Sequence, residues 1–391
     1  MKKKISILGA TGSIGISALS IVDKKKFIFN VILLSSNKNF QIICKQINKY
    51  KPKYYLINDL KTYKKVKNKY KKSNVKILNS LDLNKKKIKS DITITAIPGI
   101  AGLSPTINIL SKTKKILIAN KESIICGWNL IKQKAKRSKT EIVPVDSEHY
   151  SIRELIKNNK IENIEKIYLT ASGGPFLNLK ISKFKKIRPK DALTHPKWKM
   201  GKKITIDSST LMNKIFELIE AHKLFNIPLS KIDILIHPNS LVHAIVKFKN
   251  GLTKILYHDT SMTIPLANAI FDGNLSIKEF LDKNKKSKSN SFPNLIFKKP
   301  NKKIFPIIKV IKRINEFPST PIILNSANEV LVEHFLQKNI PFLSISKIIM
   351  AIMNDKNYKK YAIKRPKNIN QIKSIDHWAR EITLRKLKKL K

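Results

Sequence analysis

Ile5-Ser-Ile-Leu8, followed directly by Gly9-Ala-Thr-Gly12-Ser-Ile-Gly15, is the stretch that decides the fold. The pattern predicts a β-strand from Lys4 to Leu8 and a helix that begins near Ser13 and runs to Val22. Glycines at such a turn let the backbone approach a pyrophosphate, whose negative charge then faces the helix N-terminus. The stretch therefore favours a dinucleotide-binding α/β domain, although G-x-x-G-x-x-G also fits a plain turn.

The basic start of the chain offers a second interpretation of the same residues. Met1-Lys-Lys-Lys4 before an apolar run resembles a secretory signal peptide. Three glycines break the apolar run, and no small-residue cleavage site precedes Asp23-Lys-Lys-Lys26. We therefore expect a first strand and helix here.

The second expected strand, Phe29 to Leu34, bears on which dinucleotide is bound. It is followed by Ser35-Ser-Asn37-Lys38-Asn39, where an NAD site normally places an acid for the ribose hydroxyls. Only neutral and cationic groups stand here, and these suit a 2′-phosphate. The segment therefore favours NADP over NAD.

Two further buried strands are expected at Asp91–Ala96 and Lys115–Ala119. Each ends in an expected loop, Ile97–Gly102 and Asn120–Ser123. Because doubly wound sheets bind ligands at the carboxyl ends of their strands, both loops are candidate site segments.

The composition excludes several classes of protein. The chain has 391 residues, 42% of them hydrophobic, which excludes wholesale disorder. No stretch approaches the roughly 18 apolar residues of a membrane span. Two cysteines cannot build a disulfide framework, so a reducing, cytoplasmic location is expected.

The net charge of +53 raises the question of nucleic-acid binding. Lys and Arg number 79 against 26 acids, but nearly all the basic residues are lysines spread along the chain. Arginine, rather than lysine, makes bidentate contacts to phosphates and bases. We therefore expect a solvated surface that attracts anionic substrates, and no dedicated nucleic-acid site.

Three carboxylates form a candidate metal site. Asp146 and Glu148 follow a strand at i and i+2, where an extended backbone points both to one side. Residues 207–220 read as a helix opened by a Ser or Asp cap, with Asn213, Glu217 and Glu220 on one face. An all-oxygen set of Asp146, Glu148 and Glu217 suits Mg²⁺ or Mn²⁺. A solvated acidic loop and an ordinary helix face remain the alternatives.

A candidate phosphate site draws on two stretches. Thr170-Ala-Ser172-Gly-Gly-Pro175 supplies hydroxyls and a glycine turn, and Ser208, Asn213 and Lys214 supply further donors. A tight structural turn is the alternative for the first stretch. Between them, Thr194–Gly201 is expected to be a loop in which Trp198 and Met200 form a lid or a docked corner. His237–His243, after a strand at Asp233–Ile236, fits either core or site.

Taken together, these motifs resemble those of the 1-deoxy-D-xylulose 5-phosphate reductoisomerase family. The matching stretches are Gly9–Gly15, Ala119–Ser123, Pro144–His149, Thr170–Phe176, His195–Gly201, Asp207–Glu217, Leu235–Ser240 and Asn325–Glu329. They occur in family order over nearly the whole chain, so the set is far more specific than any one member.

The resemblance implies an NADPH- and divalent-metal-dependent conversion of 1-deoxy-D-xylulose 5-phosphate to 2-C-methyl-D-erythritol 4-phosphate. It implies metal ligands at Asp146, Glu148 and Glu217, for Mn²⁺ or Mg²⁺ with Co²⁺ as a further candidate, and catalytic roles for Lys121, Glu148 and His195. The implied substrate contacts are Lys121, Ser147, Glu148, Ser172, His195, Ser208, Asn213, Lys214 and Glu217. The implied NADPH contacts are Thr11, Gly12, Ser13, Ile14, Asn37, Lys38, Asn39, Asn120, Glu122 and Gly201. A homodimer is implied by the family alone.

Two positions depart from the family pattern. Ile215 stands where the family usually has glycine, and Thr260-Ser-Met-Thr263 replaces its usual Pro-Asp-Met-Arg. Both put local packing in question, and the second also bears on subunit contacts. None of the proposed metal or phosphate ligands is affected.

We expect an α/β protein with a Rossmann-like NADPH-binding domain at 1–146, a catalytic α/β domain at 147–284, a polar linker at 285–306 and a C-terminal α-helical domain at 307–391. Helical spacing at Ile307–Ile314 and Ala327–Gln337, and a basic amphipathic helix from Asp376, support the last. Two other functions fit parts of the pattern: another NADP-dependent dehydrogenase, and a basic nucleic-acid-binding protein. The carboxylates and phosphate donors argue against the first.

Overall fold

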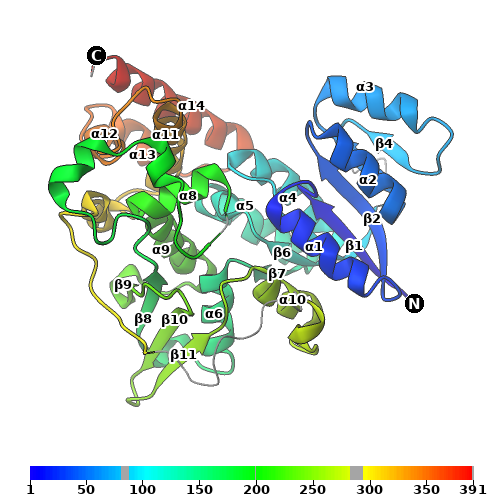
Figure 1. Ribbon diagram of the computed structural model, residues 1–391, viewed down its shortest axis with the longest axis horizontal. Coiled ribbons are helices and arrows are strands. Elements are labelled where there is room, and N and C mark those ends of the chain that lie inside the picture. Colours follow the sequence, from blue (N-terminus) through cyan, green and yellow to red (C-terminus); the bar gives the residue numbers. More distant parts are fainter. Residues whose placement is uncertain (81–87, 199, 282–293, 390–391) are drawn as a thin grey trace. The chain divides into compact units, whose positions relative to one another are not determined.

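The computed structural model describes residues 1–80, 88–198, 200–281 and 294–389. The chain forms two compact units (Figure 1). The first unit comprises residues 1–123, 128–150 and 261–292, and the second comprises 124–127, 151–260 and 293–391. The linker expected at 285–306 begins among residues that lie outside the described part.

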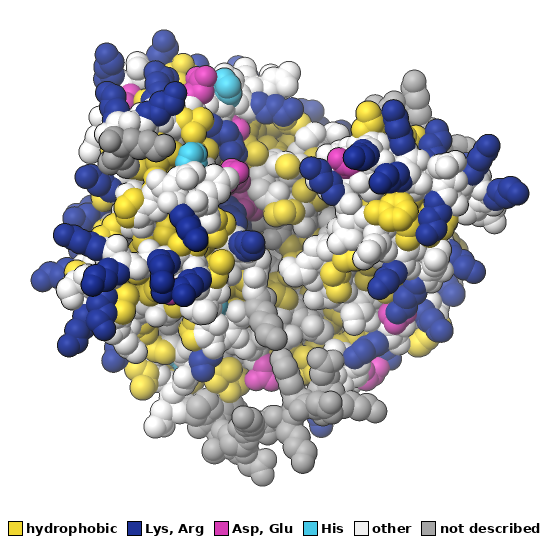
Figure 2. Space-filling view, turned by 45° about the horizontal axis from the view of Figure 1, so that its top comes forward, with side chains coloured by type: hydrophobic (Ala, Val, Ile, Leu, Met, Phe, Trp, Pro, Cys, Tyr) yellow, Lys and Arg dark blue, Asp and Glu magenta, His cyan; other side chains and the backbone are white. Residues whose placement is uncertain are grey.

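On the face drawn in Figure 2, Lys and Arg side chains do not gather into one stripe. Figure 2 shows Lys and Arg spread over the whole visible face among polar and apolar side chains. This distribution agrees with a solvated lysine surface. Among the described residues, no helix combines the length and the apolar character that crossing a membrane requires.

The first unit is built on a seven-stranded sheet in which every neighbouring pair is parallel. Its order is β4-β3-β2-β1-β5-β6-β7. The strands are β1 (Lys3–Leu8), β2 (Phe29–Ser36), β3 (Tyr54–Ile57), β4 (Lys76–Leu78), β5 (Ser90–Thr95), β6 (Thr113–Ile118) and β7 (Glu141–Pro144). Chain order reverses between β1 and β5, which is the switch point where such sheets bind ligands.

Helices join these strands, as the sequence predicted for a doubly wound domain. They are α1 (Ser13–Lys24), α2 (Phe40–Tyr50), α3 (Leu60–Lys69) and α4 (Leu103–Ile109). The first unit also contains α10 (Thr263–Phe271), which comes from the later segment 261–292. Two further helices, α5 (Lys121–Ser138) and α6 (Ser147–Ile156), have residues in both units.

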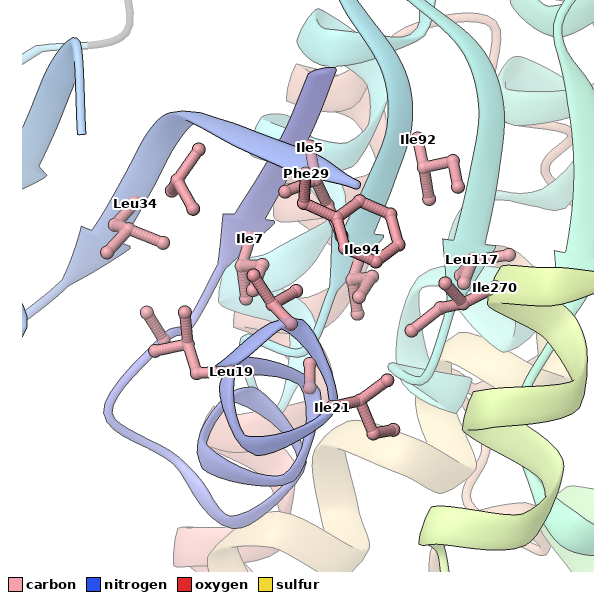
Figure 3. Close-up of a cluster of buried hydrophobic side chains, with 14 of the residues drawn as sticks. Ile5, Ile7, Leu19, Ile21, Phe29, Leu34, Ile92, Ile94, Leu117 and Ile270 are labelled. Carbon is pink, nitrogen blue, oxygen red and sulfur yellow. The ribbon is translucent and has the colours of Figure 1, made fainter. Parts of the chain in front are cut away.

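The core of the first unit lies between the sheet and the pair α1 and α10 (Figure 3). Ile7 on β1 and Ile94 on β5 are fully buried, and Ile21 from α1 and Ile270 from α10 belong to the same cluster. Strands buried in this way are nearly continuous in apolar residues, which is why they could be located in the sequence. The core fixes β1 and α1, and therefore the glycine turn between them.

The second unit contains a mixed four-stranded sheet, ordered β11-β10-β8-β9. Its strands are β8 (Ile164–Ala171), β9 (Ile232–Ile236), β10 (Val242–Phe248) and β11 (Thr253–Tyr257). β8 and β9 run parallel, whereas β10 is antiparallel to both β8 and β11. α9 (Met212–Phe225) packs on β8 and β9.

The remaining helices of the second unit confirm a helical C-terminal region. They are α7 (Pro189–Ala192), α8 (Lys202–Thr210), α11 (Thr320–Leu336), α12 (Ser344–Met353), α13 (Tyr358–Ala362) and α14 (Ile369–Lys388). α11 packs against α14 and against α8. The helical stretch expected at Ile307–Ile314 is a 3-10 helix, Pro306–Arg313.

Candidate functional site

The turn between β1 and α1 requires glycine at two positions. Gly9 has φ +89, and a Cβ there would lie 2.6 Å from the carbonyl oxygen of Ala96. A Cβ at Gly15 would collide with the carbonyl oxygen of Gly9. Gly12 stands at the N-cap of α1, so the amides of Ser13 and Ile14 begin the helix. The turn thus presents backbone N–H groups where a phosphate would bind.

The end of β2 holds this turn, and the predicted 2′-phosphate residues follow it. The carbonyl of Ser35 accepts the N–H of Gly9 at 3.1 Å and of Ala10 at 2.7 Å. Asn37, Lys38 and Asn39 follow, and all three are exposed. Asn39 is the N-cap of α2, because its side chain accepts the N–H of Ile42. These residues lie in the first unit, at the carboxyl end of the strand beside β1.

The segment expected as a loop at Asn120–Ser123 is instead the start of a helix. Asn120 caps α5, and its side-chain oxygen accepts the N–H of Ser123 at 2.7 Å. The Asn120 amide also donates to the carbonyl of Gly99 and to the Glu122 carboxylate, both at 3.0 Å. The cap converts an expected loop into a rigid first turn carrying Lys121 and Glu122.

Asp146 and Glu148 are not on an extended backbone, so the reason given for their pointing to one side is wrong. β7 ends at Pro144, and α6 begins at Ser147. The Asp146 side chain accepts the N–H of Glu148 at 3.3 Å. An acid after a strand is also a favourable helix N-cap, and Asp146 stands directly before α6 in that position.

Lys121 and His149 hold Asp146 ionised. Lys121 Nζ lies 2.9 Å from Asp146 Oδ2, and His149 Nδ1 lies 3.4 Å from Oδ1. Burial alone would raise the pKa of this carboxyl, but Lys121 and His149 outweigh burial and hold the pKa well below its usual value. The contact of His149 with Asp146 was not predicted from the sequence. His149 follows Asp146 by three residues, so the two side chains meet only because a helix begins there.

In the second unit, Ser172 and His195 are brought together at 3.0 Å between Oγ and Nε2. His195 Nδ1 accepts the backbone N–H of Lys197 at 3.1 Å and of Trp198 at 2.9 Å. Since backbone amides only donate, Nδ1 carries no proton, and Nε2–H donates to Ser172. Ser172 Oγ also accepts the N–H of Gly174, so its own O–H remains to donate to a ligand.

His195 is therefore a neutral ring that fixes the start of the 194–201 loop. Burial lowers the pKa of His195 to about 4, in agreement with its two acceptor bonds at Nδ1. The loop has no helix or strand among its described residues, as expected. Trp198 packs edge-on against His243, with ring centroids 6.0 Å apart.

Ser208 does not cap a helix, which corrects the prediction for residues 207–220. Asp207 and Ser208 lie in the last turns of α8, and a left-handed residue, Leu211 (φ +69), separates α8 from α9. Thr210 supplies the hydroxyl that accepts the N–H of Met212. Ser208 nevertheless lies near the turn at Ser172–Pro175, because a Cβ on Gly174 would be 3.1 Å from the carbonyl oxygen of Ser208.

The first turns of α9 bring together three predicted site residues. Asn213 Nδ2 lies 2.5 Å from Glu217 Oε1, and Lys214 forms an ion pair with Glu217. Lys214 and Glu217 are almost fully buried. The part of the predicted helix face formed by Asn213 and Glu217 is confirmed.

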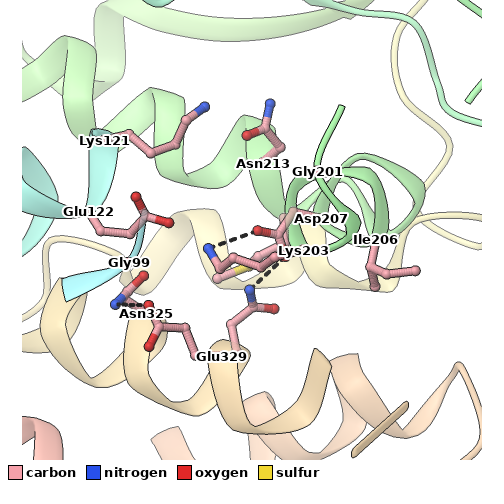
Figure 4. A network of polar contacts seen from close by, with 12 residues as sticks. Gly99, Lys121, Glu122, Gly201, Lys203, Ile206, Asp207, Asn213, Asn325 and Glu329 are labelled. Carbon is pink, nitrogen blue, oxygen red and sulfur yellow. Dashed lines mark hydrogen bonds and ion pairs between the residues drawn. The ribbon is translucent and has the colours of Figure 1, made fainter. Parts of the chain in front are cut away.

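A buried polar contact beneath this region was not predicted. Asp207 pairs with Lys203 at 3.0 Å and accepts a hydrogen bond from Asn328 at 2.7 Å (Figure 4). This contact links α8 to α11 and explains part of the Asn325–Glu329 motif. Its partners lie 121 residues apart in the chain, so no local pattern could have identified it.

The structure also places the remaining residues that the sequence singled out. His237 and His243 are buried, and the Thr170 hydroxyl donates to the carbonyl of Val242, so it is part of the sheet. Ile215 is fully buried in α9. Gly201 is the N-cap of α8.

A parallel sheet with a glycine turn at its switch point, followed by carboxylate and phosphate-type donors, defines a dinucleotide-dependent oxidoreductase. Family models agree. Residues 5–127 match 1-deoxy-D-xylulose 5-phosphate reductoisomerase, residues 142–225 match that family's C-terminal domain, and residues 259–382 match the DXP reductoisomerase C-terminal domain.

Curated relatives extend the match to the whole chain. The reductoisomerase of Pelagibacter ubique is 47% identical over 96% of this chain and 97% of its own length. That of Wolbachia sp. subsp. Drosophila simulans is 41% identical over 90% of each. The chain belongs to the 1-deoxy-D-xylulose 5-phosphate reductoisomerase family.

Solved structures show the same fold. A DOX-P reductoisomerase in complex with NADPH, fosmidomycin and magnesium is 30% identical, with a TM-score of 0.88 over 99% of both chains. The Zymomonas mobilis enzyme in complex with NADPH is also 30% identical, with a TM-score of 0.86 over 99% of both chains. The predicted fold class, the oxidoreductase assignment, and NADPH and a divalent metal as cofactors are confirmed.

Proposed function

We propose that the residues described above carry out the family's reaction in this chain, the rearrangement and reduction of 1-deoxy-D-xylulose 5-phosphate to 2-C-methyl-D-erythritol 4-phosphate. The single observation that carries the proposal is the cluster at the start of α6, where Asp146 is kept ionised beside Lys121. The ionised Asp146 carboxylate can bind a divalent metal, and the Lys121 ammonium group can bind an oxygen-rich anionic substrate.

For the metal, we propose Asp146, Glu148 and Glu217 as ligands. Their carboxylate oxygens are the donors that Mg²⁺ and Mn²⁺ prefer, so the residues fit the ion. Asp146 pairs with the ammonium group of Lys121 and Glu217 with that of Lys214, so each carboxylate already binds a cationic group. When bound, the metal would polarise adjacent substrate oxygens as a Lewis acid.

For proton transfer, we propose Lys121 and Glu148. Lys121 Nζ can donate a proton, and the Glu148 carboxylate can accept one. The Ser147 hydroxyl lies 2.5 Å from Glu148 Oε2 and donates to it, which orients that carboxylate. Both side chains are set by helix starts, so they are held on rigid first turns of α5 and α6.

For the substrate phosphate, we propose Ser172, Ser208, Asn213 and Lys214. The Ser172 O–H is oriented outward by the two bonds that its oxygen accepts. Lys214 supplies charge, and His195 joins Ser172 to the 194–201 loop. Closure of this loop with Trp198 and Met200 would exclude water from the reacting fragments.

For the coenzyme, we propose that Thr11 to Ile14 bind the pyrophosphate, that Asn37, Lys38 and Asn39 bind the 2′-phosphate, and that Asn120, Glu122 and Gly201 contact the nicotinamide end. The helix N-terminus at Gly12 and the absence of an acid after β2 in the sequence support the first two groups. NADPH supplies the hydride that reduces the rearranged aldehyde.

Activity with matched variants tests this assignment. NADPH absorbance would be followed with 1-deoxy-D-xylulose 5-phosphate and Mn²⁺, with and without a chelator. We expect metal-dependent oxidation that falls at least ~100-fold in Asp146→Asn, because losing a metal ligand costs more than the roughly 10- to 100-fold cost of losing a residue that only supports a ligand. Glu162→Gln, an exposed acid in the second unit, serves as the control. Turnover that survives in Asp146→Asn would contradict the assignment.

We propose a homodimer formed through β11. This strand is at one edge of its sheet, and Leu252, Ile255 and Tyr257 are 60%, 44% and 36% exposed there. An edge strand with exposed apolar residues favours pairing with another strand. Light scattering should give a dimer for the wild type and a monomer for Ile255→Asp, with the exposed Leu60→Asp as control. A dimeric Ile255→Asp would contradict β11 as the interface.

We also propose that the chain acts in the cytoplasm without a nucleic-acid partner. We further propose the functional division 1–146, 147–284, 285–306 and 307–391. Lysines dispersed over the surface support the absence of a nucleic-acid site. α10 packs on α1 within the first unit, so the functional division need not follow the two compact units. A gel-shift titration with duplex DNA at physiological salt tests the partner proposal; saturable binding would contradict it.

A further inference from the structure

Gln46, on the second turn of α2, makes two buried hydrogen bonds inside the first unit. Its Nε2 donates to the carbonyl of Ala10 at 2.8 Å. Its Oε1 accepts the hydroxyl of Tyr55 at 2.6 Å. Gln46 is 5% exposed, and Ala10 and Tyr55 are fully buried. A polar side chain satisfied on both sides in this way is fixed in one position.

The partners determine which way the amide faces. A backbone carbonyl only accepts a hydrogen bond, so the Gln46 nitrogen must face Ala10. Tyr55 then donates its O–H to the remaining amide oxygen, and burial, which raises the pKa of Tyr55, keeps that hydroxyl protonated. A neutral amide is the side-chain group that can donate to one partner and accept from the other, so a carboxylate or an alkyl group cannot replace it.

Ala10 is part of the glycine turn. Its own side chain is a methyl group, so the turn is held from outside. On one side the carbonyl of Ser35 accepts the N–H groups of Gly9 and Ala10. On the other side Gln46 holds the carbonyl of Ala10. The peptide planes of the turn are thus anchored through both their N–H and their C=O groups.

The same helix begins at the segment proposed for the 2′-phosphate. Asn39 caps α2, and Gln46 follows seven positions later, about 10 Å along the helix axis. Ile43 and Ile47, on either side of Gln46 in the chain, are buried in the core. α2 therefore cannot shift without moving the anchor of the turn.

We propose that Gln46 is a positioning residue for the coenzyme: it holds the Gly9–Gly15 turn in the shape that receives the pyrophosphate. The inference rests on the proposed NADPH site. Because NADPH and NADH share the pyrophosphate, Gln46 supports the binding of both coenzymes equally, whereas Lys38 would support only NADPH.

The test is equilibrium binding of NADPH and NADH, measured by nicotinamide fluorescence, together with kcat at saturating NADPH. In Gln46→Leu, which keeps the size of the side chain, both dissociation constants should rise by a common factor of roughly 10, the scale of a lost buried hydrogen bond. The kcat should stay within about twofold. Gln46→Glu should behave like Gln46→Leu, since its carboxylate faces the Ala10 carbonyl, and Tyr55→Phe should give a smaller rise.

Thr140→Val is the matched control for a loss of stability alone. Thr140 donates a buried hydrogen bond to the carbonyl of Leu110 at 2.7 Å, elsewhere in the first unit. It should lower the melting temperature as Gln46→Leu does and leave both dissociation constants unchanged. If Gln46→Leu fails to fold, Tyr55→Phe against Thr140→Val decides the question in the same way.

Three results would overturn the inference while leaving the proposed function intact: unchanged coenzyme affinity in Gln46→Leu, an equal rise in Thr140→Val, or a rise for NADPH alone. The proposed function fails separately, if the wild type binds neither coenzyme. The two failures are therefore distinguishable in one set of titrations.

Discussion

The protein has two regions suited to binding phosphate groups, and the two use different chemical groups to do so. The Gly9–Gly15 turn uses main-chain amides, and its anchors are a carbonyl and a neutral amide. The corner of Ser172 and His195 uses side chains, and a neutral imidazole holds it together. The turn contains no titratable side chain, whereas the corner depends on one, His195.

The two regions therefore differ in how far they can change shape: the turn is rigid, and the corner can open. Glycines at the turn are required by close contacts with backbone, so the turn cannot change shape without steric conflict. The corner can open when His195 leaves Ser172, because the adjoining loop has no helix or strand of its own among its described residues. We therefore expect the coenzyme site to respond to backbone changes and the substrate site to respond to side-chain and pH changes.

The largest effect is expected from Gly15→Val. Its side chain would collide with the backbone of Gly9 and Ala10, which overpacks the turn. We expect NADPH affinity to fall by more than about 100-fold, because the turn must move by a sizeable fraction of an ångström. Fluorescence titration measures it. Ser20→Val is the control, since it places the same side chain at an exposed position of α1, and similar losses in both variants would contradict the steric argument.

Ser172→Ala should have the next largest effect, confined to the substrate. It removes a hydroxyl whose O–H is aimed by two accepted hydrogen bonds. Loss of a hydrogen bond to a charged group raises KM for the phosphorylated substrate by roughly 10- to 100-fold. NADPH affinity should not change. An equal loss for both ligands would show that the two regions are not independent.

Acid pH should weaken substrate binding through His195. The docked ring has its pKa lowered from 6.5 to about 4, so the detached ring gains a proton first as the pH falls. Docking is fully favourable above pH 6.5 and weakens as the pH falls toward about 4. Between about pH 7.5 and about pH 5.5, KM for substrate should rise roughly 10-fold more in the wild type than in His195→Asn.

His195→Asn is the matched variant because its side-chain oxygen can still accept the N–H groups of Lys197 and Trp198. The phosphate of the substrate titrates identically in both proteins, so the difference isolates the ring. The same KM profile in both proteins would exclude His195 as the group responsible.

The smallest effect is expected at Lys38, which is exposed. In Lys38→Gln, the preference for NADPH over NADH should fall by about fivefold, the scale of one exposed ion pair of roughly 1 kcal/mol. Steady-state kinetics with each coenzyme measure the ratio. An unchanged preference would assign the 2′-phosphate to Asn37 and Asn39 or to another segment.

The sequence predicted the first region better than the second for a physical reason. The strand, the glycines and α1 are contiguous, so their pattern contains nearly all the information that the turn needs. The end of α8 is different, because Ser208 and Thr210 both suit a cap, and the left-handed Leu211, a buried residue, decides between them. Packing set that choice, and no local pattern reports it.

Asp146 shows a second limit. An acid after a strand fits both an extended backbone and a helix cap, and the cap formed. The contact of His149 follows from that helix, so it was missed for the same reason. Gln46 and Asn328 were missed because their partners, Ala10 and Asp207, lie far away in the chain.

The most direct test of the account is the binding of Mn²⁺, followed by electron paramagnetic resonance in the presence of NADPH. Asp146 and Glu217 are both proposed as ligands of this ion. We predict one tightly bound Mn²⁺ per chain in the wild type, weakened at least ~10-fold both in Asp146→Asn and in Glu217→Gln. Full affinity in either variant would contradict the shared site.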